Sequence, residues 1–566
     1  MRNFILLILS IILSTYTLNA QVAKRYDIVI DELFPDPTPQ VQLPVAEFIE
    51  LRNVSGEPFN LSGWTISDGT STAKLPSFIL EPDSFVIICS QSASVAFSSI
   101  GSAIGVSNFP SLNNDADMIF LRSPENVIIH TVNYSAEWFQ NELKKDGGWS
   151  LEMIDTRNPC SGSTNWKAST DERGGTPGHL NSVDGINGDE RSPKLLGAFS
   201  EDSTHLTLVF NEPLDSLKGG TISNYMISDG ISVLSAETIA PLFDKVSINL
   251  SSTLVPDKVY TVTASNVPDC SGNVISHDNT TRFGLASFPD TFDIVINEML
   301  FHPRPGGTDY IEIYNRSRKI FDVKQLHIAN RNNTGVISNI SKLSEESRLF
   351  FPGDFVMLAE DIAVVQQQYL CKDPGALLTV PNLPSFPNDK GDVIILNAQG
   401  DVLDEVRYND KWHFSLLSST EGVALERIDY NSPSIESNFH SAATSAGYGT
   451  PGYKNSQYTS NQFSGEMTLS PEIFSPDNDG LDDFLTINYR FPSAGYVANI
   501  TIFDANGRPV RYLQQNALCG ISGNYRWDGL DAKNQKLQRG IYIVYTEIFN
   551  TNGNKKLFKN TVVLAR

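Results

Sequence analysis

The chain has 566 residues, 40% of them hydrophobic and 10% aromatic, and a formal net charge of −23. At about 150 residues per domain, this length predicts about four domains. The acidity argues against binding to nucleic acids or anionic membrane surfaces, which both depend on clustered lysine and arginine. It is typical of a soluble extracellular protein and is compatible with divalent cations.

Residues 1–20 have the pattern of a secretory signal peptide, in which an apolar run at 4–13 precedes a polar stretch that ends at Ala20. That run is too short for a permanent spanning helix, which needs about 20 residues, and no later apolar run is long enough. We therefore expect an exported protein without a transmembrane helix. It would be secreted or held at the outer cell surface after removal of the signal peptide.

Two stretches of the chain, each about 155 residues long, share their openings, their exits and several motifs in between. Their offset of roughly 270 residues is far too long for a solenoid repeat, so the pattern predicts one domain duplicated around an inserted domain. The matching segments are 27–33 and 293–299, 48–53 and 310–315, 117–121 and 392–396, 132–134 and 406–408, 150–155 and 424–429, and 176–178 and 450–452.

This pattern resembles the lamin tail domain, an immunoglobulin-like β-sandwich also found in secreted bacterial proteins. The resemblance is carried by the Asp/Asn-Glu opening, the Phe/Tyr-Ile-Glu strand, the Leu-Ser-Gly-Trp segment at 61–64 and the Thr-Pro-Gly exit. The second copy departs from it at 323–326, which read Val-Lys-Gln-Leu. We predict lamin tail domains at 26–182 and 291–456, the second with a short helix inserted at 359–370.

The remaining two segments also read as short strands of period two. Residues 191–288 resemble a bacterial Ig-like domain, through Asn211-Glu-Pro213 and the turn at 269–273. Residues 466–566 follow a polar linker at 455–465. They resemble the Ig-like domain of flagellar hook-assembly proteins and the C-terminal modules of exported Bacteroidetes proteins, which often address a protein to the type IX secretion system. The predicted fold is all-β, with four Ig-like β-sandwich domains in series. The export machinery is an expected partner through the last domain.

Five cysteines raise the question of a disulfide, which an exported chain permits. Cys89 and Cys160 both lack a cysteine counterpart in the second copy, so the two differ together as a bonded pair would. We therefore predict a Cys89–Cys160 disulfide. Two unrelated buried thiols, or a bond between Cys160 and Cys270, are the alternatives.

Repeated carboxylates invite a catalytic interpretation. Glu32 and Glu50 of the first copy recur as Glu298 and Glu312, and paired carboxylates can hydrolyse glycosides. Because the repetition follows from the duplication, we favour a structural role. In that role the two glutamates of one copy meet across strands and are paired with a base such as Arg52 or capped by backbone amides.

The acidic turn at 477–483 is the candidate cation site. Calcium requires several hard oxygens on a sharply turning loop, and Gly480 permits such a turn. Ser475 stands where the first acidic ligand of a calcium loop would be, and a plain Asp-Gly turn before a strand explains the same residues. The calcium ligands would be Asp477, Asp479, Asp482 and Asp483.

The sequence contains no zinc-binding histidine motif, no nucleophile elbow and no phosphate-binding loop. We predict a non-catalytic protein that acts in adhesion, scaffolding or ligand display toward an extracellular protein or glycan. Trp138 and Trp412 are the candidate ligand-binding residues, although a place in the core is the favoured interpretation of both. The rival functions are a carbohydrate- or polymer-binding accessory of secreted hydrolases and a hydrolase itself.

Overall fold

The computed structural model describes residues 22–458, 465–551 and 555–565, so the predicted signal peptide at 1–20 lies outside the described residues. Strands dominate these ranges, which contain two short α-helices, α1 (Ser94–Phe97) and α2 (Ile362–Gln368). The second confirms the helix expected in the inserted segment. In the described part of the chain neither helix has the length and apolarity needed to cross a membrane.

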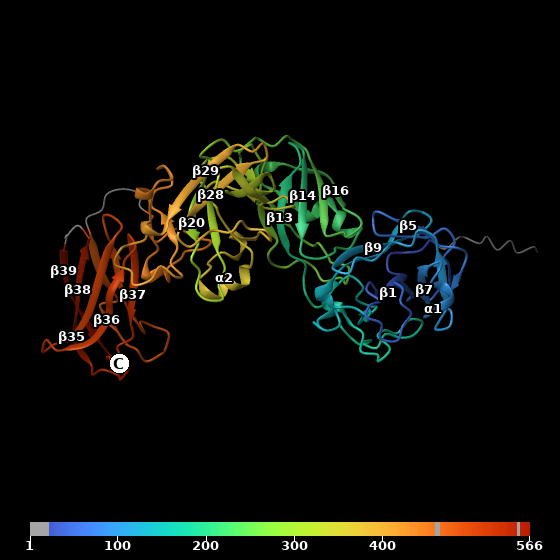
Figure 1. Ribbon diagram of the computed structural model, residues 1–566, viewed down its shortest axis with the longest axis horizontal. Helices are drawn as coiled ribbons and strands as arrows, with labels where there is room; N and C mark the ends of the chain where they lie inside the picture. The colour runs from blue at the N-terminus through green and yellow to red at the C-terminus, as the bar shows by residue number, and fades with distance from the viewer. Residues whose placement is uncertain (1–21, 459–464, 552–554, 566) are drawn as a thin grey trace, which may run out of the picture. The chain divides into compact units, whose positions relative to one another are not determined.

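The chain divides into two compact units, described separately below. Unit 1, blue to green in Figure 1, contains the first repeat and most of the sandwich that follows it; unit 2 contains the second repeat and the last domain. Unit 1 comprises residues up to 198, 204–252 and 261–282, and unit 2 comprises 199–203, 253–260 and the residues from 283 onward.

The first repeat is a sandwich of two main sheets. Its strands are β1 (Ile28–Phe34), β2 (Phe48–Asn53), β3 (Phe59–Asn60), β4 (Thr65–Ser67), β5 (Thr72–Lys74), β6 (Ile79–Leu80), β7 (Phe85–Ser90), β8 (Ala103–Val106), β9 (Ala116–Arg122), β10 (Ile128–Ser135), β11 (Leu151–Met153) and β12 (Trp166–Ala168). The large sheet has the order β12-β11-β1-β2-β7-β8, the second sheet has the order β10-β9-β4-β5, and β3 pairs with β6.

The large sheet of the first repeat is buried on both faces. One face packs against the second sheet through Ile28, Ile30 and Leu51, and the other face carries a smaller cluster that includes Phe48 and Phe97. Every residue of β1 is therefore buried, which explains why its sequence is nearly continuous in apolar residues. Polar side chains in this strand are enclosed by the fold.

The second repeat has the same topology. Its strands are β20 (Ile294–Leu300), β21 (Tyr310–Asn315), β22 (Phe321–Asp322), β23 (Leu326–Arg331), β24 (Ile337–Lys342), β25 (Leu349–Phe350), β26 (Phe355–Ala359), β27 (Leu377–Thr379), β28 (Lys390–Asn397), β29 (Val402–Asn409), β30 (Leu425–Arg427) and β31 (Phe439–Ser441). The sheet orders β27-β26-β21-β20-β30-β31 and β24-β23-β28-β29 match those of the first repeat strand for strand. A β-bulge also recurs, between Ile30 and Glu32 and between Ile296 and Glu298.

The two other domains are smaller sandwiches. The middle one has the sheets β13-β14-β17-β16 and β15-β18-β19, and the last one has the sheets β32-β34-β37 and β33-β39-β38-β35-β36. Their strands are β13 (Leu195–Ser200), β14 (His205–Phe210), β15 (Tyr225–Ile227), β16 (Val233–Thr238), β17 (Lys245–Leu250), β18 (Tyr260–Ala264), β19 (Thr280–Phe283), β32 (Glu466–Ser470), β33 (Ile473–Phe474), β34 (Leu485–Arg490), β35 (Tyr496–Asp504), β36 (Pro509–Leu518), β37 (Ser522–Trp527), β38 (Gly540–Asn550) and β39 (Lys555–Leu564). The predicted all-β fold is confirmed.

The predicted linker at 455–465 is wrong at its start. Asn455 and Gln457 are buried in the second repeat. The side-chain amide of Asn455 donates to the backbone oxygen of Asn297 at 3.1 Å, and the backbone N–H of Gln457 donates to Glu426 at 2.8 Å. Polar composition misled here because these side chains satisfy buried polar groups. Residues 459–464 lie outside the described residues.

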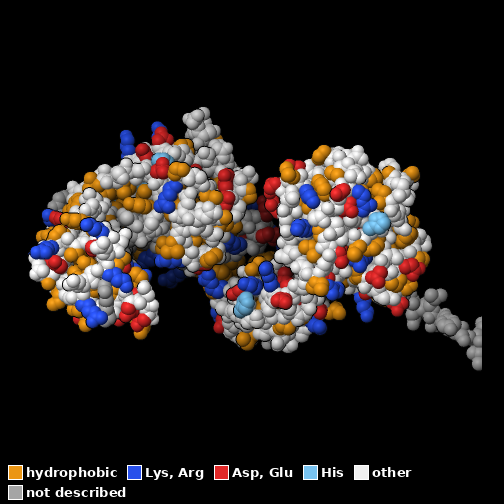
Figure 2. Space-filling view, turned by 90° about the horizontal axis from the view of Figure 1, so that it is seen from below, with side chains coloured by type: hydrophobic (Ala, Val, Ile, Leu, Met, Phe, Trp, Pro, Cys, Tyr) orange, Lys and Arg blue, Asp and Glu red, His pale blue; other side chains and the backbone are white. Residues whose placement is uncertain are grey.

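One face of the protein carries charges of both signs. On the face drawn in Figure 2, aspartate and glutamate side chains are interspersed with lysine and arginine. On this face the charge pattern differs from the basic stripe that nucleic-acid binding requires.

The predicted Cys89–Cys160 disulfide is also wrong. Cys160 is bonded to Cys270, with Cα atoms 6.5 Å apart, which lies in the usual range for disulfides. Cys89 is a free, buried thiol in β7. The two copies differ at this position because it is a core site that takes a small apolar side chain, cysteine in one copy and Ala359 in the other. The observed bond ties the first repeat to the middle sandwich.

We expect removal of this bond to destabilise unit 1. The bond joins residues 110 positions apart, and the chain-entropy model gives about 5 kcal/mol for so long a loop. A variant with both Cys160→Ser and Cys270→Ser should therefore unfold at a lower temperature in calorimetry. Peptide mapping without reductant should yield a linked peptide that contains Cys160 and Cys270. A linked peptide that contains Cys89 would contradict the assignment, and Cys89→Ala should leave the map otherwise unchanged.

Candidate functional site

A row of three buried glutamates crosses the large sheet of the first repeat. Glu32 of β1 lies opposite Glu50 of β2 on one side and opposite Glu152 of β11 on the other. All three residues are 0% exposed. Burial of a carboxylate is costly unless hydrogen bonds compensate for the lost water, so the groups around the row determine what it can do.

The Thr-Pro-Gly exit segment caps this row. Thr176 donates its backbone N–H to Glu32 Oε1 at 2.8 Å and its hydroxyl to Glu152 Oε1 at 2.9 Å. Gly178 donates its backbone N–H to Glu50 Oε2 at 2.5 Å. The exit segment therefore closes the buried face of the sheet through hydrogen bonds to all three carboxyl groups.

The second repeat reproduces this row with Glu312, Glu298 and Glu426, all 0% exposed. Thr450 donates its backbone N–H to Glu298 Oε1 at 2.9 Å, and Gly452 donates its backbone N–H to Glu312 Oε2 at 2.6 Å. The expected capping by backbone amides is thus confirmed in both copies.

Of the two alternatives, pairing with a base such as Arg52 or capping by backbone amides, the structure shows the second. Arg52 lies 3.8 Å from Asp184 in an ion pair instead. Sequence comparison of the copies missed Glu152 and Glu426, although both lie in the recurring segments at 150–155 and 424–429. Because all six glutamates are enclosed and hydrogen-bonded, a polymeric substrate has no access to them. Their arrangement is that of an internal brace.

One residue next to the row of glutamates differs between the copies. The bulge residue is Asn297 in the second repeat, where its side-chain amide donates to Glu312 Oε1 at 2.7 Å. The first repeat has Asp31 there, fully buried, and both of its carboxylate oxygens lack a hydrogen-bond partner among the described residues. Oε1 of Glu50, the counterpart of the oxygen that Asn297 serves, lacks a partner as well.

Burial controls the titration of these groups. It raises the pKa of Asp31 from 3.8 to about 7, opposed in part by the positive charge of Arg52. Burial, reinforced by the neighbouring glutamate charges, also holds the pKa values of Glu32 and Glu50 well above the usual range. In the second repeat burial raises the pKa of Glu426 to about 8. Glu32, Glu50 and Glu426 therefore retain protons at pH values where exposed carboxyl groups have lost them.

The two predicted ligand-binding tryptophans lie at corresponding places. Trp138 lies in a 3₁₀ turn, η1 (Ala136–Phe139), and its ring centroid is 6.3 Å from that of Trp166. Trp412 lies in η8 (Asp410–Trp412), with its ring centroid 5.9 Å from that of Phe439. Both indoles are half-buried and pack against the core of their repeat. Ligand binding by either stays a prediction.

The acidic turn at 477–483 brings three of its four predicted ligands together. Carboxylate oxygens of Asp477, Asp479 and Asp483 lie within 4.8 Å of one another, whereas Asp482 is outside this group. Asp482 instead accepts from the backbone N–H of Ser475 through its own backbone oxygen, at 2.9 Å. The carboxylate of Asp483 accepts the backbone N–H groups at 478 and 480. These contacts are those of a self-capped turn, and calcium binding stays a prediction.

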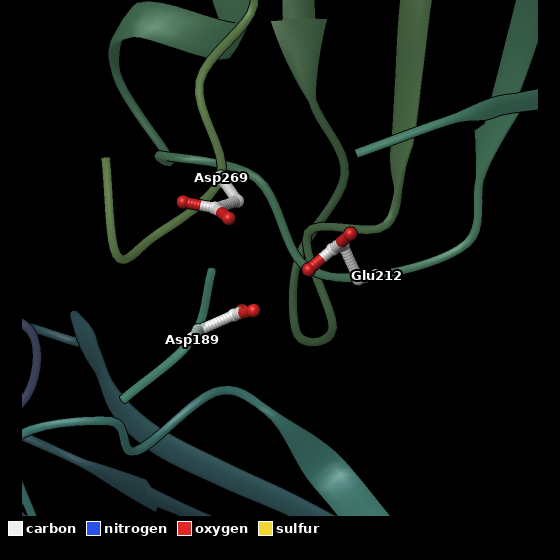
Figure 3. A group of neighbouring side chains, drawn as sticks. All are labelled: Asp189, Glu212 and Asp269. Atoms are coloured by element: carbon white, nitrogen blue, oxygen red, sulfur yellow. The ribbon is translucent and has the colours of Figure 1, made fainter. Parts of the chain in front are cut away.

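A second carboxylate group, which the sequence did not reveal, lies in unit 1 and is drawn in Figure 3. Asp189 follows the first repeat, and Glu212 and Asp269 lie on two loops of the middle sandwich. Burial and the Asp189 charge raise the pKa of Glu212 to about 7. Asn273 bridges the loops, because its side-chain amide donates to Asp269 Oδ2 at 2.9 Å and to the Asp189 backbone at 3.1 Å. Asn273 thus links the segment after the first repeat to the middle sandwich.

Comparison with known proteins identifies two parts of the chain. The lamin tail domain family matches residues 21–136, and the type IX secretion signal domain family (CHU_C) matches residues 468–564. Both families confirm resemblances expected from the sequence. The second repeat lies outside both matched stretches, so its assignment as a lamin tail domain stays a prediction that its topology supports. A type IX secretion signal domain indicates export to the cell surface or the medium.

Solved structures give only distant likenesses. The N-terminal part of the bacterial S-layer protein SbsC shares 18% identity over 30% of this chain and 40% of that one, with a TM-score of 0.16. PorZ, a surface component of the type IX secretion system of Porphyromonas gingivalis, shares 11% identity over 80% and 56%, with a TM-score of 0.15. A DUF4876 family protein from Bacteroides thetaiotaomicron shares 13% over 45% and 92%, with a TM-score of 0.17.

The chain spans about half the length, or less, of the S-layer structures that it matches. No curated protein matches the chain. At these identities and TM-scores the likenesses do not extend to function.

We expect Asp31→Asn to stabilise the protein in a pH-dependent way. Unfolded Asp31 loses its proton near pH 4, whereas folded Asp31 keeps it to about pH 7. A rise in pH between these values therefore lowers the free energy of unfolding. The substitution removes this loss of stability, which above pH 7 is on the order of 2–4 kcal/mol in the free energy of unfolding. It also supplies an amide for Glu50, as Asn297 does for Glu312.

Thermal unfolding of the two proteins should therefore differ little at pH 4, and the variant should melt about 5 °C higher at pH 8. The matched control is Asn297→Asp, which should lower the melting temperature at pH 8. A difference that does not change with pH, or a destabilised Asp31→Asn variant at pH 8, would show that Asp31 is not a buried acid of this kind.

Proposed function

We propose that this protein is a non-catalytic component of the bacterial cell surface or its secretions, and that it acts by adhesion, scaffolding or ligand display. The observation that carries the proposal is the type IX secretion signal domain at 468–564, placed after a series of β-sandwiches that are braced from within. The recurring acidic residues are used for this bracing, which leaves recognition to the loops. Loops on a rigid framework are the usual place for binding residues.

The joint between the first repeat and the middle sandwich supports a role in holding and spacing. Besides the disulfide, the guanidinium of Arg25 stacks on the ring of Phe243 at 3.9 Å and donates to the backbone oxygen of Leu214 at 3.2 Å. The hydroxyl of Thr131 donates to the backbone oxygen of Pro241 at 3.0 Å. A covalent bond and several buried contacts make a joint that resists bending, as a spacer exposed outside the cell requires.

Unit 2 contains a comparable joint. Phe414 of the second repeat packs with Val497 and Leu518 of the last domain. The hydroxyls of Ser445 and Tyr489 lie 2.7 Å apart, in hydrogen-bond contact. The secretion signal domain is therefore docked on the repeat before it, which suits a domain that stays with its cargo during export.

Export is tested with a tagged chain in a host that has a type IX secretion system. The full chain should be found at the cell surface or in the medium. Deletion of residues 466–566 should leave the protein inside the cell envelope, because the secretion signal domain has been removed.

The control is a deletion of the middle sandwich, residues 191–288, combined with Cys160→Ser so that Cys160 is not left without its disulfide partner. This variant keeps the last domain and should still reach the outside. Equal export of the chain that lacks residues 466–566 would contradict the proposal, as would phosphodiester or glycoside hydrolysis by the purified full chain.

A further inference from the structure

A small cavity lies in unit 1 where the first repeat meets the middle sandwich. Its volume is about 170 Å³, below the about 300–1,000 Å³ of pockets for drug-sized ligands and well above the space that a few waters fill. The cavity therefore has room for a single ring. The walls come from both domains, so the disulfide and the Arg25 contacts that fix the joint also fix the shape of the cavity.

The apolar side of the cavity is aromatic. Trp138 and Trp166 both line it, with their ring planes inclined by 41°. Trp166 is fully buried, whereas Trp138 is half-buried, so part of its side chain is accessible to a ligand. Val132 and Leu242 extend this apolar wall.

The lining of the cavity also includes polar residues. Asn133 and Asn211 are exposed, and Glu212 and Asp244 are half-buried. The side-chain amide of Asn211 donates to Glu212 Oε1 at 3.1 Å, and its oxygen accepts the backbone N–H of Lys194 at 2.5 Å. Carboxylates accept hydrogen bonds from hydroxyl groups, and amides can both donate to hydroxyl oxygens and accept from hydroxyl protons.

We propose that this cavity binds one neutral sugar ring, such as the end of a glycan chain. A pyranose has an apolar C–H face that packs on an aromatic ring, and an equator of hydroxyls that both donate and accept. The lining of the cavity contains groups suited to both chemistries. The two carboxylates outnumber the guanidinium of Arg25 in the lining, and in a chain of net charge −23 they disfavour an acidic sugar. The inference rests on the proposed function, for which it names the ligand class of one binding site.

The second repeat provides an internal comparison. Its tryptophan, Trp412, corresponds to Trp138, but Phe439 stands at the position of Trp166, because both residues begin the edge strand that pairs with the Glu152 or Glu426 strand. Thr291 and Phe292 stand where the first repeat has Arg25 and Tyr26. The second tryptophan of the cavity wall and the arginine of the joint are thus present in the first repeat and replaced at the corresponding positions of the second.

The test uses the full chain on a printed array of neutral and acidic oligosaccharides, in buffer with chelator. A neutral saccharide should bind, and its affinity should fall by about tenfold or more in Trp138→Ala, since truncation of an aromatic anchor removes most of a small contact. Glu212→Gln should also weaken binding. Trp149→Ala, at a half-buried tryptophan of the same repeat that does not line the cavity, is the matched control and should leave affinity within about twofold.

Trp138→Phe keeps an aromatic face and should retain most of the affinity, and the melting temperature of each variant separates lost binding from lost folding. The proposal is overturned if no neutral saccharide binds, if acidic saccharides bind better, if chelator abolishes binding, or if Trp138→Ala leaves binding unchanged in a folded protein. Export of the full chain does not depend on the cavity, so failure here and failure of the export experiment are distinguishable.

Discussion

Each lamin-tail-like repeat depends on carboxylates that are buried in the middle of its large sheet and capped by its own last residues. In the first repeat, Thr176 and Gly178 donate backbone N–H groups to Glu32 and Glu50, and the second repeat has the same contacts 274 residues further along at Thr450 and Gly452. A buried carboxylate without these donors would cost several kcal/mol. The sandwich is therefore complete only when its exit segment is in place, which joins the two ends of a long stretch of chain into one cooperative domain.

This constraint also explains where function can reside. The acidic residues that recur in both copies resemble a catalytic pair in the sequence, yet they face the interior and stabilise it. The proposed recognition site is the joint of unit 1, where a disulfide and the stacked Arg25 hold two sandwiches around a small cavity. The type IX secretion signal domain at 468–564 is the signal for export. The sandwiches form a stiff body that can present such a site outside the cell.

Much of the fold could be predicted from the sequence, and the reasons are local. Alternating apolar residues and turn residues mark the strands, and the repeated opening at Glu32 and Glu298 reveals the duplication. The errors involve contacts between residues far apart in the chain. Neither the partner of Cys160 nor the burial of Asn455 can be inferred from neighbouring residues. Cys160 bonds to Cys270 in another domain, and Asn455 is buried by its contact with Asn297, which is distant in the sequence. The cavity escaped prediction for the same reason, although Trp138 was singled out.

Hydrogen exchange at the two exit segments tests the central claim most directly. If the backbone N–H groups of Thr176, Gly178, Thr450 and Gly452 are bonded to buried glutamates, their exchange should be among the slowest in the protein and should require unfolding of the whole repeat. Exchange at the rate of an exposed loop, while the neighbouring strands stay protected, would contradict the account, because the glutamate rows would then be open to solvent.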